Sequence, residues 1–336
     1  MQIELDTLDR AILNILQWEF PLTHRPFLAI AERLNVSEDD IISRVKALKE
    51  SNIIREIDAI FDTRALKYKS ALVAMSVEPS RIEDVAYEIN RHPGVSHNYE
   101  RDHYYNLWFT IAVPPYGNVK HEVKRFLLHG VREYMILPTV KLYKIGVRLD
   151  MLADEEQQEV RPTEEVKSIQ RVDFEASEED KRFIREMQKD IDLVREPFSV
   201  SASRLGVSVD AYLEKMRYYQ SIGVMRRFAA ILRHRNAGFI ANGMIVWIVP
   251  EERIDDVGFR LASYPQVSHC YRRPVYPSWP YNLYTMVHAR SRDVCESIAS
   301  EMSAHVGIKD YTILFSTREF KKERVRYYLE DEYQVT

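Results

Sequence analysis

The sequence predicts an α+β chain in which one unit occurs twice, each copy being a winged helix-turn-helix followed by a ferredoxin-like βαββαβ domain. An internal repeat is the first observation behind this: "RPFLAIAERLNVSEDD" (25–40) matches "EPFSVSASRLGVSVDA" (196–211), and "YMILPTVKLYK" (134–144) matches "YTILFSTREFK" (311–321). The second is a change of hydrophobic period inside each copy, from helical spacing to strand-like alternation. The copies lie about 171 to 177 residues apart, too far for a solenoid, which indicates a duplicated or fused two-domain unit.

The first part of each copy is predicted to be helical. Apolar residues recur at helical spacing, and Ser37 with Asp40 three residues later resembles a capping box at the start of a third helix. The stretch 52–62 then alternates as the strand of a wing would. The apolar positions of the first and third helices are Leu5, Leu8, Ile12, Ile15, Ile41, Val45 and Leu48.

The second part of each copy alternates strands and helices. In the first copy, strands are predicted at 70–79, 97–99, 107–113 and 134–144, with a helix between the first two and another at 117–130. The order βαββαβ is ferredoxin-like, and its sheet has one open face that must be covered. We therefore expect the two copies to pack sheet to sheet as an internal pseudo-dimer.

The predicted domain boundaries follow from the repeat and from composition. The stretch between the copies is acidic with little apolar periodicity, which is typical of a solvated linker. The expected divisions are a winged helix-turn-helix (1–63), a ferredoxin-like domain (64–149), an acidic linker (150–174), the second winged helix-turn-helix (175–235), the second ferredoxin-like domain (236–325) and a C-terminal tail (326–336).

Composition and charge restrict the class of protein. Of 336 residues, 46% are hydrophobic and 29% charged, the proportions of a soluble globular protein, and no run of eighteen apolar residues predicts a membrane span. Two cysteines, Cys270 and Cys295, cannot form a disulfide framework and lack zinc-ligand spacing. With an acidic N-terminus that is unlike a secretory signal, these features predict a cytoplasmic protein. A net charge of −4 makes nucleic acid an unfavourable partner.

One chemically rich segment occurs in both copies. It is "GVSHNYERDHYYNLWFT" at 94–110 and "QVSHCYRRPVYPSWPYNLYTM" at 266–286. A single histidine on a strand is more often structural than functional. Two histidines at matched positions, His97 and His269, each within Val-Ser-His-x-Tyr, favour a shared function.

The order of domains resembles the Lrp/AsnC family, and "SRVKALKESNIIRE" (43–56) is similar to that family's recognition helix and wing. The doubled segment resembles more specifically the two subunits of the siroheme decarboxylase family, fused here in one chain. The resemblance implies a carboxy-lyase that removes the acetate carboxyls at C12 and C18 of siroheme. The implied product is 12,18-didecarboxysiroheme, for heme or heme d1 synthesis.

Siroheme as substrate also suggests roles for residues. Its flat macrocycle would need aromatic surface, its eight carboxylates would need guanidinium groups, and its iron and the reacting carbon would need a ligand and a proton donor. The candidate catalytic residues are His97, His269, Tyr99 and Tyr271, with His269 the candidate iron ligand. The candidate substrate-binding residues are Arg101, Arg272, Arg273, Trp108, Trp279, Tyr281, Asn282, Tyr284, Arg55 and Arg226. No cofactor is expected beyond the iron that siroheme carries.

These candidates differ in how strongly the sequence supports them. The double arginine and the "YPSWPYNLYT" insertion of the second copy favour His269 over His97. Trp279 lies in an irregular loop, which favours a pocket, whereas Trp108 and Tyr284 lie on strands and are equally suited to a core. For Asn282 a turn-forming role competes with ligand contact. Arg55 and Arg226, at the matched wing position, could equally be solvated charges or interdomain ion pairs.

Two other functions compete with the enzyme. A ligand-responsive transcription regulator would use Arg44, Lys46 and Lys49 on the third helix, but the same helix opens with Glu38, Asp39 and Asp40, which would face the phosphates. A non-catalytic heme-binding sensor would share every site residue. The sequence leaves open whether the pseudo-dimer pairs again through its winged helices.

Overall fold

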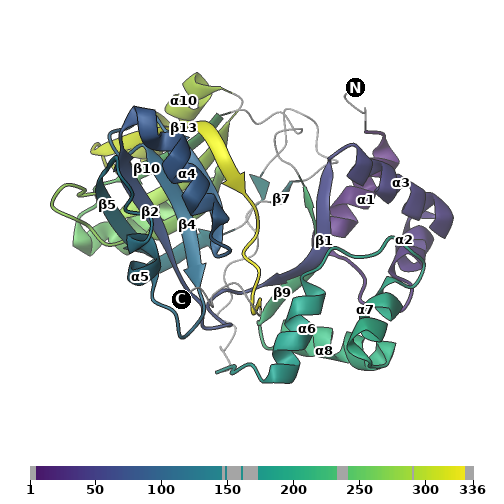
Figure 1. Cartoon of the computed structure of the whole chain (residues 1–336). Helices are drawn as coiled ribbons and strands as arrows, with labels where there is room; N and C mark the ends of the chain where they lie inside the picture. Colours follow the sequence, from purple (N-terminus) through teal and green to yellow (C-terminus); the bar gives the residue numbers. More distant parts are fainter. Residues whose placement is uncertain are drawn as a thin grey trace.

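The computed structural model describes residues 5–145, 148–149, 160–161, 173–232, 241–289 and 291–329, and its elements form two lobes (Figure 1). One lobe holds the helices of both winged helix-turn-helix domains, and the other holds both ferredoxin-like domains. Most of the linker predicted at 150–174 lies outside the described residues. Within the described part, no helix is long and apolar enough to cross a membrane.

The helical lobe contains three helices and one strand from each copy. Ser37 is the N-cap of the third helix and accepts a hydrogen bond from the Asp40 backbone N–H, which confirms the predicted start. The elements are α1 Thr7–Trp18, α2 Pro26–Leu34, α3 Glu38–Glu50 and β1 Ile54–Phe61, then α6 Glu178–Met187, α7 Pro197–Leu205, α8 Val209–Ser221 and β9 Met225–Leu232.

The two helical domains share one hydrophobic core instead of packing as separate bodies. Strands β1 and β9 pair antiparallel, with Ile57 opposite Ala230, and so join the copies by backbone hydrogen bonds. Phe20 of the first copy contacts Phe198 and Phe228 of the second, with ring centroids 6.3 and 5.0 Å apart. The two helix trios are thus fixed relative to each other.

Each ferredoxin-like domain supplies four strands and helices that cover one face. In the first copy these are β2 Lys69–Val77, α4 Ile82–Arg91, β3 Val95–Arg101, β4 Leu107–Val113, α5 Val119–Lys124 and β5 Val131–Pro138, followed by β6 Lys141–Ile145. In the second they are β10 Ala241–Trp247, α9 Ile254–Ala262, β11 Val267–Arg272, β12 Leu283–Ala289, α10 Arg292–Val306 and β13 Tyr311–Lys322. Short 3-10 turns, Pro79–Arg81 and Glu251–Arg253, precede α4 and α9, and β7 Arg148–Leu149 pairs with β8 Val160–Arg161.

The last strand of each copy crosses into the sheet of the other. The strand order is β5-β2-β4-β3-β13-β10-β12-β11-β6. Strand β13 pairs first with β10 of its own copy and then with β3 of the other, while β5 pairs with β2 and its continuation β6 pairs with β11. The edges at β3 and β11 are therefore each covered by a strand of the other copy.

The crossing strand is continuous in one copy and interrupted in the other, whereas the sequence predicted one strand over 134–144. Pro138 ends β5, and the matched residue of the second copy is Phe315, inside the twelve-residue β13. Proline has no backbone N–H to donate to a ladder, so pairing stops there and resumes at β6.

The expected sheet-to-sheet packing of the copies is confirmed by a core between the two sheets. Its largest fully buried members are Trp108 and Tyr284, from β4 and β12, and Trp279 from the loop before β12. Separate cores lie between each sheet and its own helices.

A close contact at Gly258 also joins the copies. A Cβ at Gly258 of α9 would lie 2.6 to 2.8 Å from three ring carbons of Tyr143 in β6. The Tyr143 hydroxyl donates a hydrogen bond to Asp255 at 2.6 Å, and the backbone of β6 pairs with β11. The ring is therefore fixed both at its hydroxyl and at its backbone. The matched residue in α4 is Ala86, where the crossing strand presents Phe320 instead.

We predict that Gly258→Ala lowers the free energy of unfolding by about 1–3 kcal/mol, because a rigid ring cannot move aside without loss of its hydrogen bond and strand pairing. Urea unfolding measures this. Glu252→Ala, an exposed change in the 3-10 turn before α9, should leave stability unchanged. Equal stability of Gly258→Ala and the wild type would show that β6 tolerates displacement.

Candidate functional site

The first predicted set of residues lies on one face of β3. Asn98 points toward α4, where its amide donates to Asn90 at 2.9 Å. Because side chains alternate along a strand, His97, Tyr99 and Arg101 point the other way, toward the second sheet. The His97 and Tyr99 rings stack with centroids 6.2 Å apart, and the Arg101 guanidinium lies 5.8 Å from the Tyr99 ring centroid.

The second set repeats this geometry on and after β11. The His269 and Tyr271 rings stack at 6.0 Å, and the Arg273 guanidinium lies 4.9 Å from the Tyr271 ring centroid. Cys270 points to the opposite face, where its Sγ approaches the Gly258 carbonyl at 3.5 Å. Cys270 is buried and forms no disulfide. Each copy thus has one surface that carries a histidine, a tyrosine and an arginine, which we call its His–Tyr–Arg face. The first face consists of His97, Tyr99 and Arg101, and the second of His269, Tyr271 and Arg273.

The arginines of the two faces bind across the pseudo-dimer in a reciprocal manner. Arg101 donates to the Leu314 carbonyl at 2.7 Å, and Arg273 donates to the matched Leu137 carbonyl at 2.5 Å. Within the described residues, the Nε atom of each has no hydrogen-bond partner. Burial lowers the pKa of Arg101 to about 10 and lowers that of Arg273 as well. A guanidinium that is removed from water and has an N–H without a hydrogen-bond partner is energetically unfavourable. A carboxylate that enters the site would accept this hydrogen bond and stabilise the charge.

His97 lies in a dry and electropositive environment. Burial is the main cause that lowers its pKa to about 4, and the charges of Lys322 and Arg55 lower it further. Lys322 is opposite His97 in the β13–β3 pairing, and Arg55 donates to the Lys322 carbonyl at 3.2 Å. Arg55 also forms an ion pair with Glu56. At neutral pH the imidazole is therefore uncharged, and its Nδ1 lies 2.9 Å from the Ser96 hydroxyl.

His269 has an additional histidine nearby that His97 lacks. Its Nδ1 lies 2.9 Å from the Ser268 hydroxyl, and Nε2 of His288 lies 3.0 Å from the same oxygen. At the position that matches His288, the first copy has Ala112. Because the first copy has no histidine at the matched position, the repeat gives no reason to select His288 as a site residue. Its link to His269 follows only from the pairing of β11 with β12.

The predicted aromatic residues are part of the core between the sheets. Trp279 is 1% exposed, its Nε1 donates to the Tyr284 hydroxyl at 2.7 Å, and its ring lies 5.4 Å from that of Trp108. The structure thus differs from the expectation that this loop residue faces a pocket. The loop folds back through the Tyr276–Trp279 bridge and fills space between the sheets. A substrate contact of these residues stays a prediction, and it would require the core to open.

Three other predicted binding residues have protein partners in the structure. The Asn282 side chain bonds to both backbone groups of Val249, as Asn106 does with Val77, and the Tyr281 hydroxyl contacts Thr312. Arg272 is separated from the His–Tyr–Arg face. It follows Tyr271 directly and pairs with Glu251 at the start of α9, on the helix side of the sheet.

Arg226 lies close to the second His–Tyr–Arg face. It forms an ion pair with Asp62 at 2.6 Å, and its charge contributes to the environment of the Tyr271 hydroxyl. Burial is the main cause that raises the pKa of Tyr271. The matched wing residues Arg55 and Arg226 thus each lie beside one face.

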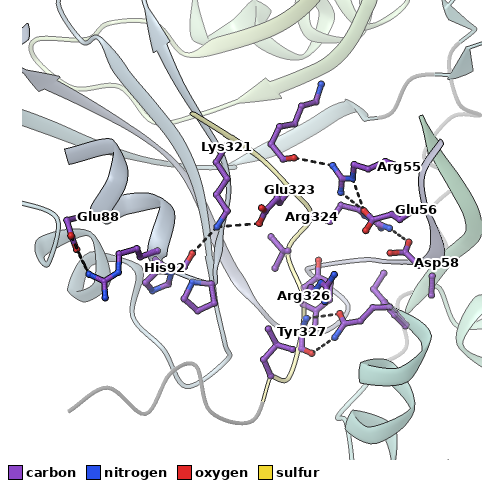
Figure 2. Close-up of a pocket in the computed structure, with 18 of the residues that line it drawn as sticks. Arg55, Glu56, Asp58, Glu88, His92, Lys321, Glu323, Arg324, Arg326 and Tyr327 are labelled. Atoms are coloured by element: carbon purple, nitrogen blue, oxygen red, sulfur yellow. Dashed lines mark hydrogen bonds and ion pairs between the residues drawn. The ribbon is translucent and has the colours of Figure 1, made fainter. Parts of the chain in front are cut away.

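A cavity of about 950 Å³ adjoins the first face. It lies between β1, the end of α4, the residues after α5 and the segment 321–329 that leaves β13 (Figure 2). Arg55 lines it and also influences His97, so the residue connects the cavity with the His–Tyr–Arg face of β3. No cluster of three potential metal-ligating side chains occurs among the described residues.

Comparison with known proteins gives the family. The model of an AsnC-like ligand binding domain matches residues 68–144 and 236–321, and that of the siroheme decarboxylase NirDL-like HTH domain matches 9–55 and 180–226. A siroheme decarboxylase of Hydrogenobacter thermophilus is 40% identical over 322 residues, which is 95% of each chain. The chain belongs to the siroheme decarboxylase family.

Other members of the siroheme decarboxylase family show the same arrangement as a fusion or as separate chains. A crystal structure of siroheme decarboxylase NirDL superposes with a TM-score of 0.76 at 35% identity, covering 96% of this chain and 95% of that one, and another contains an iron-uroporphyrin III analogue. A beta subunit from Methanosarcina barkeri is 46% identical over 44% of this chain and 97% of its own length. The duplicated unit therefore corresponds to subunits that are separate elsewhere.

We predict that His97 makes the stability of the protein depend on pH between about 6.5 and 4. The folded state binds the His97 proton less tightly than the unfolded state, so the free energy of unfolding is unaffected above 6.5 and falls as the pH drops toward 4. His97→Gln should abolish a loss on the order of 3 kcal/mol across that window, measured by urea unfolding at several pH values.

The matched control for that experiment is His129→Gln. His129 is exposed, so its substitution should leave the wild-type pH dependence in place. If His97→Gln and the wild type lose stability in parallel, the imidazole is solvated and the prediction is wrong.

Proposed function

We propose that this protein is a siroheme decarboxylase that removes the C12 and C18 acetate carboxyls of siroheme and yields 12,18-didecarboxysiroheme. Membership of the family supports this, and so does one observation on the chain itself. Each copy places a histidine, a tyrosine and an arginine whose buried Nε lacks a hydrogen-bond partner within the described residues on or directly after one strand. These are the groups that a polycarboxylate substrate with a reacting acetate needs.

The reaction is a non-oxidative carboxy-lyase step. For each acetate, the bond between the methylene carbon and the carboxylate breaks, CO₂ leaves, and the electron pair stays on the carbon next to the conjugated ring. A proton then adds to that carbon and leaves a methyl group. The balance requires one proton for each CO₂ and no oxidant, so we propose that the chain uses no cofactor beyond the iron of its substrate.

Arg101 and Arg273 are proposed to bind carboxylates that do not react. Each guanidinium is anchored by a backbone carbonyl of the other copy, so its orientation is fixed before substrate binds. Arg55 and Arg226, beside the two faces, are proposed to add positive charge where the substrate carboxylates enter.

His97 is proposed as proton donor. Burial is the main cause of its low pKa, so it carries no proton to deliver until substrate carboxylates lie close enough to favour the imidazolium and offset the charges of Lys322 and Arg55. His97 would then take up a proton when substrate binds, so the imidazole could act as proton donor only while the site holds substrate. Tyr99 and Tyr271 are the alternative donors on the same faces.

His269 is proposed as ligand of the siroheme iron. A histidine ligand usually has its other ring nitrogen hydrogen-bonded, which fixes the ring, and Ser268 contacts Nδ1 of His269. We further propose a cytoplasmic location, because both cysteines are buried and unpaired in the part of the chain that the structure describes.

The structure offers little support for the competing role as a DNA-binding regulator. Arg44 of α3 pairs with Asp6 and Asp9 at 2.8 Å, and Lys49 pairs with Asp190 of the other copy. Two of the three basic residues that would read DNA therefore bind carboxylates of the protein itself.

We predict that anaerobic incubation of the protein with siroheme yields a tetrapyrrole lighter by two CO₂, measured by mass analysis of the extracted pigment. His97→Ala should lower kcat by about 10²–10⁴ if it delivers the proton. His269→Ala should instead change the visible spectrum of the bound tetrapyrrole. Tight binding of unchanged siroheme by the wild type would favour the sensor and contradict the proposal.

We predict that His288 positions His269 through Ser268. His288→Ala should weaken binding of the iron tetrapyrrole or its turnover about ten- to hundredfold and shift its spectrum, because the shared hydroxyl loses a partner. His288→Gln, which keeps a donor, should restore most of the spectrum. His121→Ala, an exposed change on α5, is the control. A wild-type spectrum in His288→Ala would exclude the positioning role.

A further inference from the structure

The cavity in Figure 2 lies beside the first His–Tyr–Arg face without including the residues of that face. Its lining includes Arg55 and Lys322 but not His97, Tyr99 or Arg101. Figure 2 shows Glu88 and His92, at and just after the end of α4, on one side, Glu56 and Asp58 of β1 on the other, and the C-terminal segment between them. Neither the strand face nor the sequence motif accounts for this cavity.

Basic residues exceed acidic ones in the lining. Seven lysines and arginines face four aspartates and glutamates. Each acid already has a basic partner: Glu56 pairs with Arg55, Asp58 with Arg324, Glu88 with Arg91 and Glu323 with Lys321. The excess positive charge is therefore not neutralised by the acids of the cavity wall.

Arg326 is the clearest cation without a counter-charge. It is exposed, and within the described residues it has no hydrogen bond or ion pair. Its backbone is nonetheless fixed, because Gln188 bonds to both backbone groups of the next residue, Tyr327, at 2.8 Å. The segment is held to the helical lobe while the guanidinium stays available at the cavity (Figure 2).

Arg125 is a second cation suited to a ligand. Among the described residues it pairs with Glu122, at 2.9 Å, one turn away on the same helix end, and its side chain is 45% exposed. The exposed position of the guanidinium weakens this pair, so a ligand carboxylate can compete with Glu122 for it.

Apolar side chains form another part of the wall. Phe61, Phe126, Leu128 and Val325 line the cavity together with the cations. A ligand with a flat apolar body and carboxylates at its edge matches this combination better than a small inorganic anion does, because only such a ligand covers the apolar wall and meets the rim charges together.

We propose that this cavity is a second ligand site, which binds an apolar polycarboxylate through Arg326 and Arg125. Under the proposed function, on which the identity of the ligand rests, the polycarboxylate is a tetrapyrrole held outside the reacting faces. Bound there, it would also contact the C-terminal segment that ties β13 to the helical lobe, so occupancy would stabilise the contact between the lobes.

The test is equilibrium titration of the full chain with an iron-uroporphyrin III analogue, followed by absorbance. The double variant Arg125→Gln/Arg326→Gln should weaken one binding phase by roughly tenfold or more, since each lost charged contact is worth about that much. Arg132→Gln, which removes another exposed arginine, on β5, is the matched control and should bind as the wild type does. Unchanged binding by the double variant would overturn the proposal.

Thermal unfolding with citrate and with phosphate separates this inference from the proposed function. In one outcome the wild type neither binds the tetrapyrrole nor decarboxylates siroheme, but citrate raises its Tm and does not raise that of the double variant. The polycarboxylate site is then supported and the decarboxylase proposal fails. If siroheme is decarboxylated equally well by both proteins and neither is stabilised by citrate, the cavity is no such site. Equal stabilisation by citrate and phosphate would mean a general anion effect and would also overturn the inference.

Discussion

The exchange of the last strand between the two copies is the constraint on which the rest of the structure depends. A four-stranded ferredoxin-like sheet leaves β3 and β11 at its edge, and the crossing strands β13 and β6 cover them by backbone pairing. The same pairing places Lys322 beside His97 and brings Arg101 within reach of the Leu314 carbonyl. Each candidate face is therefore completed by the other copy, and neither half contains a whole site.

Because both faces are built by one pseudo-symmetric exchange, the differences between them are informative. Pro138 interrupts the crossing strand in only one direction, and His288 replaces Ala112 next to the serine that contacts the second histidine. These changes alter charge and hydrogen bonding while the shared backbone frame is kept. The arrangement allows one face to specialise in proton transfer and the other in iron ligation without a new fold.

The segment that follows β13 connects this frame to the helical lobe. Arg324 pairs with the buried Asp58 of β1, and Tyr327 is held by Gln188 and by Thr63. Burial raises the pKa of Asp58 to about 7 despite the opposing effect of Arg324, so this contact depends on the charge state of one carboxyl near neutral pH. The cavity beside the segment thus lies where the two lobes are joined.

The sequence by itself determined the repeat, the βαββαβ order and the Ser37 helix start. The order and the helix start follow from local periodicity and capping residues, and the repeat follows from residue matches between the two halves of the chain. Only the tertiary structure decided that Trp279 is buried and that His288 and Arg326 lie beside candidate sites. Those outcomes depend on which strand pairs with which and on how a loop folds back, and such contacts join residues that are distant in the chain and leave no periodic pattern in it.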